Sequence, residues 1–511
     1  TLFRSEGTTV TNEGNVTVKG GATAISVSDG AAAYHNGQMT VKESGSILDK
    51  NSVGIFGEGK TENGVKTNIE TDNLSSINVE TGTGIYATAR AMAKNGGTVN
   101  VSGGVGLRVS GGNADDWTVG QNVGSINVTN LEAVGVKVLG GAEFTNTGKV
   151  EASSETTTAD INKYAIGVYS DSEKVYNKVN GLISGTISVG KNAIGIFGGT
   201  VHNEGGDTNA KISANGEQSY GTYGVEVDNS GIISATNGGV GVFGGSLLNY
   251  GIVNVQSGIG AEDSGVINEG TFEVYGSDGI GVKGNMTNKG DVLVYGGYGL
   301  VGGGTNTGTI SNLSGEAAVK VTGSFTNGGT IEGNGTAVLV EGGTFLNRDE
   351  VKSMNGMAVD VQSGNATNYA TINTDSGIGM RIASGARGEN ATSGVINVSG
   401  SGIGALVESG GTFYNNGTIN YDSNNDGTCI SGSSGGSGKC VDAAEKQGEN
   451  SGSPSSVSSP LRLTSSATFI NNGSVNFEDV ELDFSEGNYI LGKDGAYQAT
   501  SFKGDILASA D

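Results

Sequence analysis

The feature that most constrains the fold of this chain is a sequence repeat of about twenty residues. From residue 237 onward, repeats such as GIGVKGNMTNKGDVLVYG (279–296) follow one another, and each repeat contains an asparagine near a glycine. A period near twenty with small drift is typical of a solenoid, in which each repeat forms one coil. These asparagines are separated by 18 to 21 residues and are Asn249, Asn268, Asn288, Asn306, Asn327, Asn347 and Asn368.

The segments between the asparagines have the pattern of β-strands. Short apolar runs such as IGVKG and DVLVY alternate apolar with polar residues and are rich in β-branched side chains. Glycine and Asn-x-Gly stand between them, where the chain has to turn a corner. We therefore predict an all-β fold: a right-handed parallel β-helix (β-solenoid) of roughly 20 coils, with loops extruded at its corners. An antiparallel meander is the alternative, because Asn-Gly between strands also signals hairpins.

The same repeat recurs upstream with looser spacing, so we expect the β-helix to span residues 1–421. Corner insertions are predicted near 111–122, which holds the only tryptophan, near the acidic and polar 151–163, and near the glycine-rich 206–224. Residues 87–94, ATARAMAK, are a stretch that could form a helical turn.

A long interruption separates two copies of one phrase, TFYNNGTINY (412–421) and TFINNGSVNF (468–477). We predict that the intervening 422–467 is an extruded loop and that coils continue over 468–511 up to a truncated end. The loop holds both prolines, which a stacked coil excludes because each coil needs its N–H groups. It also holds both cysteines, Cys429 and Cys440, which we expect to form a disulfide in a secreted protein. Two free thiols in a cytosolic chain are the alternative.

Candidate chemistry is sparse in this sequence. The only histidines, His35 and His202, are far apart, and no nucleophile elbow, zinc helix or Cys-x-x-Cys pair occurs. Asp422, Asn424 and Asp426 match the first half of a calcium loop, but Ser433 stands where a bidentate glutamate is needed. We therefore predict no catalytic residues, no metal beyond this half motif, no cofactor and no enzyme activity. A polysaccharide-degrading enzyme is the alternative, since β-helices host such enzymes when carboxylates cluster on adjacent coils.

The net charge of −24 argues against two classes of partner. An acidic chain without a basic run repels phosphate backbones and anionic bilayers, so nucleic-acid binding and membrane-surface binding are not expected. No apolar stretch approaches the roughly 20 residues that span a bilayer. The chain begins with TLFRSEG, in the middle of a phrase, so we expect a piece of a longer protein.

The repeats, GIGVKGNMTNKGDVLVYG and GIGALVESGGTFYNNGTINYDS in particular, resemble the passenger domains of type V autotransporters. They are most similar to the very large fusobacterial outer-membrane adhesins, over nearly the whole chain. The resemblance implies a β-helix exported to the surface of a Gram-negative bacterium. It also implies attachment to host cells, through receptors or glycans, or to other bacteria in mixed biofilms.

We therefore predict an adhesin ectodomain, a monomeric rod whose loops bind a host cell-surface protein or glycan, or a partner bacterium. The candidate contact residues are Trp117, Tyr220, Tyr223 and the loop around Cys429 and Cys440, because solenoids bind through exposed insertions. A structural stalk of a longer adhesin is the alternative function.

Overall fold

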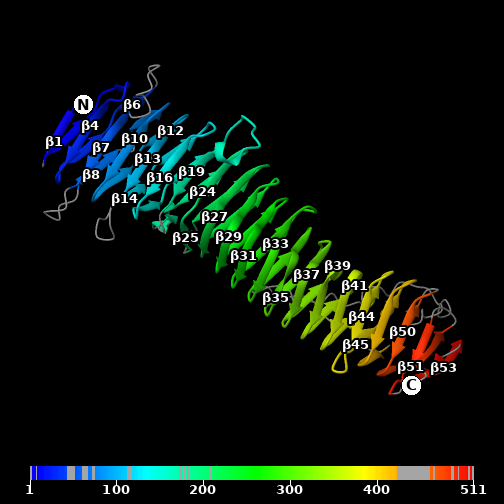
Figure 1. Cartoon of the computed structure of the whole chain (residues 1–511). Coiled ribbons are helices and arrows are strands. Elements are labelled where there is room, and N and C mark those ends of the chain that lie inside the picture. Colours follow the sequence, from blue (N-terminus) through cyan, green and yellow to red (C-terminus); the bar gives the residue numbers. More distant parts are fainter. Residues whose placement is uncertain are drawn as a thin grey trace, which may run out of the picture. The chain divides into compact units, whose positions relative to one another are not determined.

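The computed structural model describes residues 3–6, 8–42, 52–59, 67–71, 75–111, 118–171, 175–177, 179–180, 183–205, 210–422, 461–463, 466–484, 488–492, 494–504 and 507–508. The chain divides into two compact units, which we call unit 1 (Thr1–Val266) and unit 2 (Ile267–Asp511). Each unit is a parallel β-solenoid in which strands of successive turns lie side by side (Figure 1). The two units contain about 18 turns, close to the predicted number. The antiparallel meander is therefore wrong.

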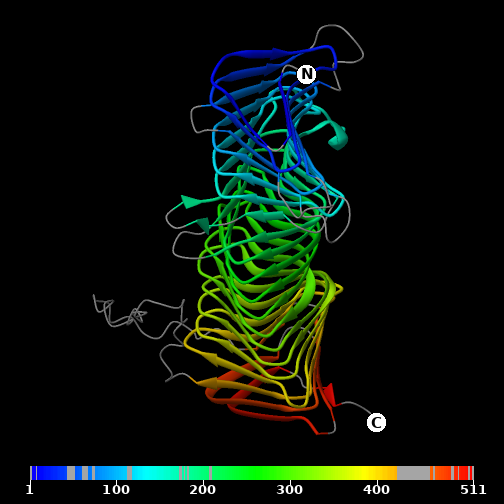
Figure 2. The same ribbon diagram turned by 90° about the vertical axis from the view of Figure 1, so that its left-hand side faces the viewer.

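Each turn has three faces, and the chain winds from one to the next around the core (Figure 2). The first and second faces belong to one sheet and the third face to another. The first face of unit 1 is formed by β1 (Phe3–Glu6), β4 (Thr23–Ser28), β7 (Val53–Glu58), β10 (Thr83–Thr88), β13 (Val105–Ser110), β16 (Val134–Leu139), β19 (Ala165–Ser170) and β24 (Ala193–Phe197). Its second face is formed by β2 (Thr9–Asn12), β5 (Ala32–His35), β8 (Thr67–Thr71), β11 (Ala91–Asn95), β14 (Val119–Asn122), β17 (Glu143–Asn146), β20 (Val175–Asn177) and β25 (Thr200–Asn203).

In the last turns of unit 1 a single long strand covers both faces. Gly224 bends the first of these strands with a φ of 63°, a conformation that glycine adopts without strain. These strands are β27 (Ser219–Asn229), β29 (Val240–Asn249) and β31 (Ile259–Asn268). The third face is formed by β3 (Val16–Val18), β6 (Gln38–Val41), β9 (Ser76–Val79), β12 (Thr98–Val101), β15 (Ser125–Val128), β18 (Lys149–Ala152), β23 (Thr186–Val189), β26 (Lys211–Asn215), β28 (Ile232–Thr236) and β30 (Ile252–Gln256). A short antiparallel pair, β21 (Val179–Asn180) and β22 (Ile183–Ser184), lies outside these faces.

Unit 2 repeats the same plan. Long strands cover its first two faces in β33 (Ile280–Asn288), β35 (Tyr298–Asn306), β37 (Ala317–Asn327), β39 (Thr336–Asn347) and β41 (Met357–Asn368). Separate strands follow: β43 (Ile378–Ile382), β46 (Ile403–Val407) and β49 (Leu461–Leu463) on the first face, and β44 (Arg387–Asn390), β47 (Thr412–Asn415), β50 (Thr468–Asn471), β52 (Asn488–Leu491) and β54 (Leu507–Ala508) on the second. The third face is formed by β32 (Thr271–Tyr275), β34 (Asp291–Val294), β36 (Thr309–Asn312), β38 (Thr330–Gly333), β40 (Glu350–Ser353), β42 (Thr371–Thr374), β45 (Val395–Ser399), β48 (Thr418–Asp422), β51 (Ser474–Phe484) and β53 (Ala496–Gly504).

The core of each turn is filled by small and β-branched residues from all three faces. In the turn made by β10, β11 and β12, Ile85, Ala93 and Val99 are fully buried. Alternation along each strand sends every second side chain inward, and parallel pairing places it on its equivalent in the next turn. Aromatic residues stack in the core in the same way, as with Phe325 and Phe345, whose ring centroids are 6.3 Å apart.

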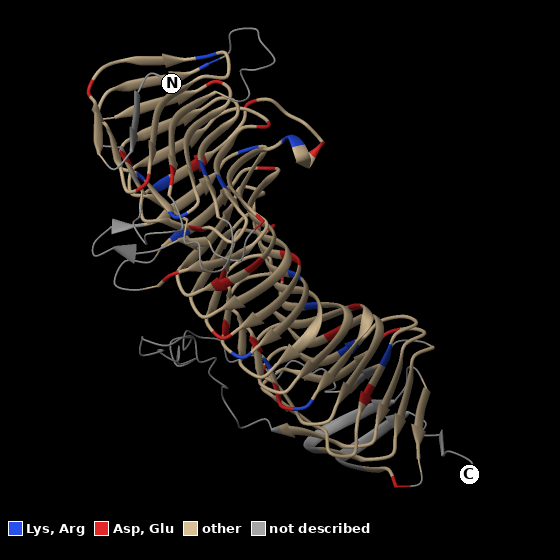
Figure 3. Cartoon of the chain, turned by 60° about the vertical axis from the view of Figure 1, so that its left-hand side comes forward, with Lys and Arg blue, Asp and Glu red and all other residues tan. Residues whose placement is uncertain are grey.

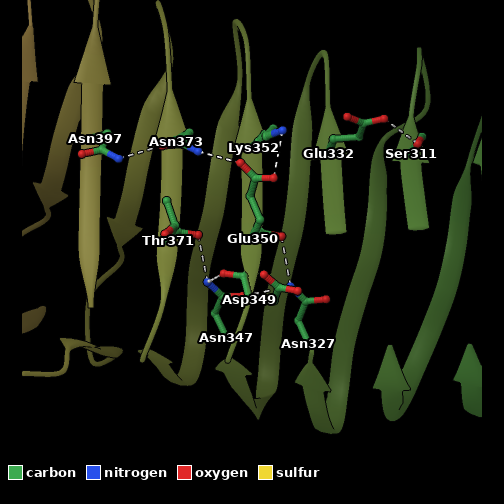
Figure 4. A network of polar contacts seen from close by, with 10 residues as sticks. All are labelled: Ser311, Asn327, Glu332, Asn347, Asp349, Glu350, Lys352, Thr371, Asn373 and Asn397. Atoms are coloured by element: carbon green, nitrogen blue, oxygen red, sulfur yellow. Dashed lines mark hydrogen bonds and ion pairs between the residues drawn. The ribbon is translucent and has the colours of Figure 1, made fainter. Parts of the chain in front are cut away.

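A column of buried asparagines stands at the corner between the second and third faces, and we call it the asparagine ladder. Each side-chain Nδ2 donates to the Oδ1 of the asparagine in the next turn over 2.7–2.9 Å. In unit 2, Asn327 and Asn347 also donate to the carbonyls of Glu350 and Thr371 on the third face (Figure 4). The ladder comprises Asn95, Asn122, Asn146, Asn177, Asn203, Asn229 and Asn249 in unit 1, and Asn268, Asn288, Asn306, Asn327, Asn347, Asn368, Asn390, Asn415 and Asn471 in unit 2.

A second amide row lies on the outside of the third face of unit 2. Asn397 donates to the Asn373 side chain over 2.9 Å, and Asn373 donates to Glu350 Oε1 over 2.8 Å (Figure 4). Lys352 pairs with the same glutamate at 2.9 Å. In-register stacking therefore produces rows of like residues outside the solenoid as well as inside it.

A glycine inside the first-face strands, as in Ala-Ile-Gly-Ile (193–196), is required by a close approach between turns. A Cβ added to Gly195 would lie 2.4 Å from the carbonyl oxygen of Gly221 in the next turn. The equivalent Gly221 faces the Gly241 carbonyl at 2.5 Å. The sequence repeats this glycine because the backbones of adjacent turns meet there.

The long interruption leaves the stacking intact. β47 and β50, on either side of it, pair in parallel, with Phe413 opposite Phe469 and Asn415 opposite Asn471. Asn415 donates to Asn471 over 2.8 Å, so the ladder resumes after the gap, as predicted. Residues 423–460, including Cys429 and Cys440, lie outside the described residues.

The structure agrees with the predicted corner insertions to different degrees. Between β18 and β19 the chain leaves the stack after Ala152 and forms a 3-10 turn, Ile161–Lys163, so the insertion predicted at 151–163 is present without residues 151 and 152, which belong to β18. The insertion predicted at 206–224 is wrong for residues 211–215 and 219–224, which form β26 and part of β27. Of its described glycines, Gly221 lies at the close approach between turns, Gly224 bends β27, and Gly216 lies at the turn between β26 and β27. The insertion at 111–122 is shorter than predicted, because 119–122 form β14.

The stretch 87–94 forms no helical turn. It runs from the end of β10 into β11, and the corner between them is made by Ala89 and Arg90 with φ of 46° and 65°. Its alanines Ala87, Ala91 and Ala93 face inward and are buried in the core.

We expect Asn327→Ala to lower the free energy of unfolding by at least about 2 kcal/mol, because it leaves the buried amides of Asn306 and Asn347 without one partner each. The exposed Asn355→Ala is the matched control and should change stability little. Urea unfolding of both variants and the parent checks this. Equal midpoints for the two variants would contradict a stabilising role for the ladder.

We expect Gly195→Ala to destabilise unit 1 by about 1–3 kcal/mol, because the added methyl has to push two turns apart. Gly265→Ala is the control, since a Cβ there meets no atom within 4 Å. Thermal unfolding of the two variants provides the comparison, and a midpoint for Gly195→Ala at or above that of the control would show the close approach to be unimportant.

Candidate functional site

The outside of the first face of unit 1 carries one residue per turn in strict register, which we call the outer row. All eight members are half-buried. They are Phe56, Tyr86, Arg108, Lys137, Tyr169, Phe197, Tyr223 and Phe243.

Local sequence explains why these side chains point outward. In β24, Ile196 is fully buried, so the next residue, Phe197, faces away from the core. Parallel pairing then places Phe197 between Tyr169 of the preceding turn and Tyr223 of the following turn. Adjacent strands are ~4.8 Å apart, which is close enough for planar rings to stack.

Four successive rings of the outer row form a continuous stack. Tyr169 and Phe197 have centroids 5.7 Å apart at 9°, Phe197 and Tyr223 5.7 Å at 4°, and Tyr223 and Phe243 5.0 Å at 16°. Each ring covers the face of its neighbour, so the stack presents ring edges to the outside. It is suited to a flat apolar contact rather than to stacking a sugar on an open ring face.

Two further tyrosines widen one end of the stack. Tyr220 packs edge-on against Tyr223 at 5.5 Å and Phe243 at 5.3 Å, and Tyr164 lies 6.3 Å from Tyr220. We call Tyr164, Tyr169, Phe197, Tyr220, Tyr223 and Phe243 the aromatic cluster. Burial is the main cause that raises the pKa of the Tyr164 and Tyr220 hydroxyls above the usual value.

A shallow cavity of about 330 Å³ lies at the corner that precedes β24 and β27. Its wall is the insertion after β18, which is fastened to the corner by the Ser154 N–H on the Lys191 carbonyl at 3.0 Å and by Asn192 Nδ2 on the Ser154 carbonyl at 3.1 Å. The corner therefore offers polar groups next to strands that carry the aromatic cluster. The cavity is lined by Thr157, Thr158, Ala159, Lys191, Asn192, Glu217 and Gln218.

The structure brings together only part of the predicted contact set. Tyr220 and Tyr223 are neighbours on β27, but they belong to a strand and not to a loop. Trp117, Cys429, Cys440, Asn424 and Asp426 lie outside the described residues, and Asp422 ends β48. Their proposed roles remain predictions.

Sequence reasoning missed Tyr169, Phe197 and Phe243. Their spacing along the chain is irregular because the intervening corners differ in length. Aligning the turns on the first-face glycines Gly167, Gly195 and Gly241 would have placed each of them two residues after its glycine, in one column.

Charged residues are sparse along the ribbon (Figure 3), and several of them pair across neighbouring turns. Arg381 bridges Asp360 and Glu408 at 2.8 Å each, and Lys320 pairs with Glu341 at 2.8 Å. Tyr298 donates to Glu316, and burial together with that glutamate raises the pKa of Tyr298 to about 12. Within the described ranges no three His, Cys, Asp or Glu side chains gather closely enough to hold a metal.

The histidines occupy strand positions. His202 lies on the outside of β25, stacked on Tyr176 at 5.2 Å and 3.4 Å from Asp228 Oδ2. His35 stands in the column of the asparagine ladder, opposite Asn12 on one side and Thr71 on the other. Its Nδ1 lies 2.9 Å from Asn12 Nδ2, so the neutral ring accepts the hydrogen bond that an asparagine would accept there.

A comparison with models of known protein families finds no match for this chain, and no curated protein matches it. Among the described residues there is no helix of the length and apolar character needed to cross a bilayer.

We expect the stability of unit 1 to fall as the pH drops below about 6.5, through His35. Burial lowers the pKa of this imidazole below its usual value of 6.5, opposed by a contact with the Ser76 backbone. The unfolded chain therefore binds the proton first, so the contribution is present above that pH and is lost as the pH falls towards the folded-state pKa.

His35→Asn restores the ladder residue and removes this titration. Urea unfolding of both proteins at pH 7.5 and 5.0 isolates the histidine, because the carboxylates are common to both. An identical pH dependence in the variant would contradict the assignment.

Proposed function

We propose that this chain is a surface-exposed adhesin ectodomain that attaches through the outside of its β-solenoid. The observation that carries the proposal is the aromatic cluster, in which four half-buried rings form a continuous stack on the outside of unit 1 and Tyr220 packs edge-on against it. Partners in this proposal are a host cell-surface protein or glycan, or the surface of another bacterium. A protein partner is favoured, since the stack presents ring edges and no open ring face.

The chemistry of the cluster supports a role in contact. Tyrosine, phenylalanine and arginine are enriched at protein interfaces, where they bury a large area with few rotatable bonds. The half-buried Tyr220 adds a hydroxyl to this apolar surface. The neighbouring corner cavity supplies amide and hydroxyl groups of the kind that surround a contact site.

The resemblance to autotransporter passengers supports an extracellular location at the outer membrane of a Gram-negative bacterium. The β-solenoid fold is compatible with that role. The proposal includes a monomeric passenger without cofactor and without catalytic activity, and it extends to virulence and coaggregation as consequences of attachment.

A structural stalk is the second candidate, and one observation favours it. The ring faces of the outer row cover one another, so the stack stabilises unit 1 even if no partner binds. A polysaccharide-degrading enzyme has no comparable observation in its favour and is tested by release of reducing ends from a glycan panel.

We expect the double substitution Tyr220→Thr and Tyr223→Thr to reduce binding to host cells at least about tenfold, because truncated aromatic anchors are the costliest losses in an interface. Threonine keeps the strand preference of the positions. The readout is flow cytometry with fluorescently labelled protein on epithelial and immune cells.

Tyr250→Thr is the matched control, because Tyr250 is 51% exposed and lies outside the cluster. Circular dichroism shows whether each variant keeps its β structure. Full cell binding by a folded double variant would reject the cluster as the contact site and favour the stalk.

A further inference from the structure

The outer row changes from aromatic to basic residues at one pair of adjacent turns, which we call the step. Between Tyr86 and Tyr169 it carries Arg108 and Lys137, two cations in direct register on adjacent turns. Like charges opposite each other on neighbouring strands destabilise a sheet. A chain with a net charge of −24 is rich in acidic residues, so a carboxylate opposite one of these cations would be the expected arrangement.

The two cations lean away from each other. The Arg108 guanidinium lies over the Tyr86 ring of the preceding turn, 4.7 Å from its centroid, and Lys137 Nζ lies over the Tyr169 ring of the following turn at 5.3 Å. Each ring attracts the positive charge through its negative face. The row is therefore divided at this step, with one cation on each side.

Neither cation has a carboxylate within 4 Å among the residues that the structure describes. By contrast, Lys94, on the neighbouring second face, pairs with Glu70 at 2.6 Å. Arg108 Nε is buried and has no hydrogen-bond partner, although a buried donor of this kind normally has one. The step therefore holds two positive charges and one unused donor.

We propose that the step between Arg108 and Lys137 binds the carboxylate of an acidic sugar. A carboxylate placed between the cations would relieve the repulsion and draw both side chains away from their rings, which would uncover Arg108 Nε for a hydrogen bond to it. Hydroxyls for the sugar ring stand beside it. Tyr86 and Ser110 share a hydrogen bond of 3.1 Å, and Ser110 donates to Thr88 over 3.3 Å.

The charge of the protein favours a sugar over an acidic peptide. The site offers two cations at one step, whereas the rest of the chain is strongly acidic. A glycan that is uncharged except for one carboxylated residue places its single charge at the step. Salt screens that charge over ~8 Å, so more distant Asp and Glu side chains repel it little. A peptide with several carboxylates would bring further charges against an acidic surface.

The test compares methyl β-glucuronoside with methyl β-glucoside, which differ only in a carboxylate in place of a hydroxymethyl group. Ligand-observed saturation-transfer NMR gives the affinity of each for the full chain. The glucuronoside should bind at least about tenfold more tightly, and the double variant R108Q/K137Q should lose this preference, since it removes the charge-assisted hydrogen bonds.

Arg348→Gln is the matched control, because Arg348 also lies over a tyrosine ring, Tyr369, at 5.2 Å, but as a single cation. It should leave the preference unchanged. The melting temperature of R108Q/K137Q tests whether the two cations have only a structural role. Because the substitutions relieve the repulsion, the melting temperature should stay the same or rise, while the binding preference is lost. A preference that survives in R108Q/K137Q, or that is absent from the parent chain, overturns the proposal.

An acetylated glutamate dipeptide is a third ligand in the same measurement. If it binds as tightly as the glucuronoside, the site recognises any carboxylate and the assignment to sugars is overturned. The inference rests on the proposed function only in treating the outer row as a contact surface. Cell binding lost with Tyr220 and Tyr223 but no sugar preference would reject this site alone, and the reverse result would reject the aromatic cluster alone.

Discussion

Direct amide-to-amide hydrogen bonds between stacked asparagines are the constraint on which the rest of this structure depends. Each ladder asparagine is buried, so its amide has to find partners in the turns above and below. A shift of one residue in any turn would turn the asparagine outward and leave its neighbours unsatisfied. The ladder therefore fixes the register of each unit, and every other stacked contact follows from that register.

Because the register is fixed, equivalent residues of successive repeats lie against one another. Inside the solenoid this is favourable, as with Phe413 on Phe469. Outside, it produces the aromatic stack from Tyr169 to Phe243 and the adjacent cations Arg108 and Lys137. The stacked rings attract one another, whereas the adjacent cations repel each other and lie over separate tyrosine rings.

Much of the fold was predictable from the spacing of Asn249 to Asn368 and from the repeated phrase at 412–421 and 468–477. The corners were harder to predict. Residues 206–224 were predicted to be a corner insertion because glycines are typical of turns, whereas Gly221 is needed where two backbones meet. His35 could not be recognised as a ladder residue either, because a histidine can replace the asparagine only when its neutral ring accepts from Asn12.

The sequence by itself determined the repeat, the strand pattern and the corner asparagines, because these are local properties with a regular period. Only the tertiary structure decided which outward side chains share a row, since turns of unequal length hide the alignment of Tyr169, Phe197, Tyr223 and Phe243. The same holds for Arg108 and Lys137, which are 29 positions apart in the chain yet directly opposite each other in the sheet. On the surface of a solenoid, neighbouring side chains come from successive turns, so these neighbours are defined only once the chain is folded.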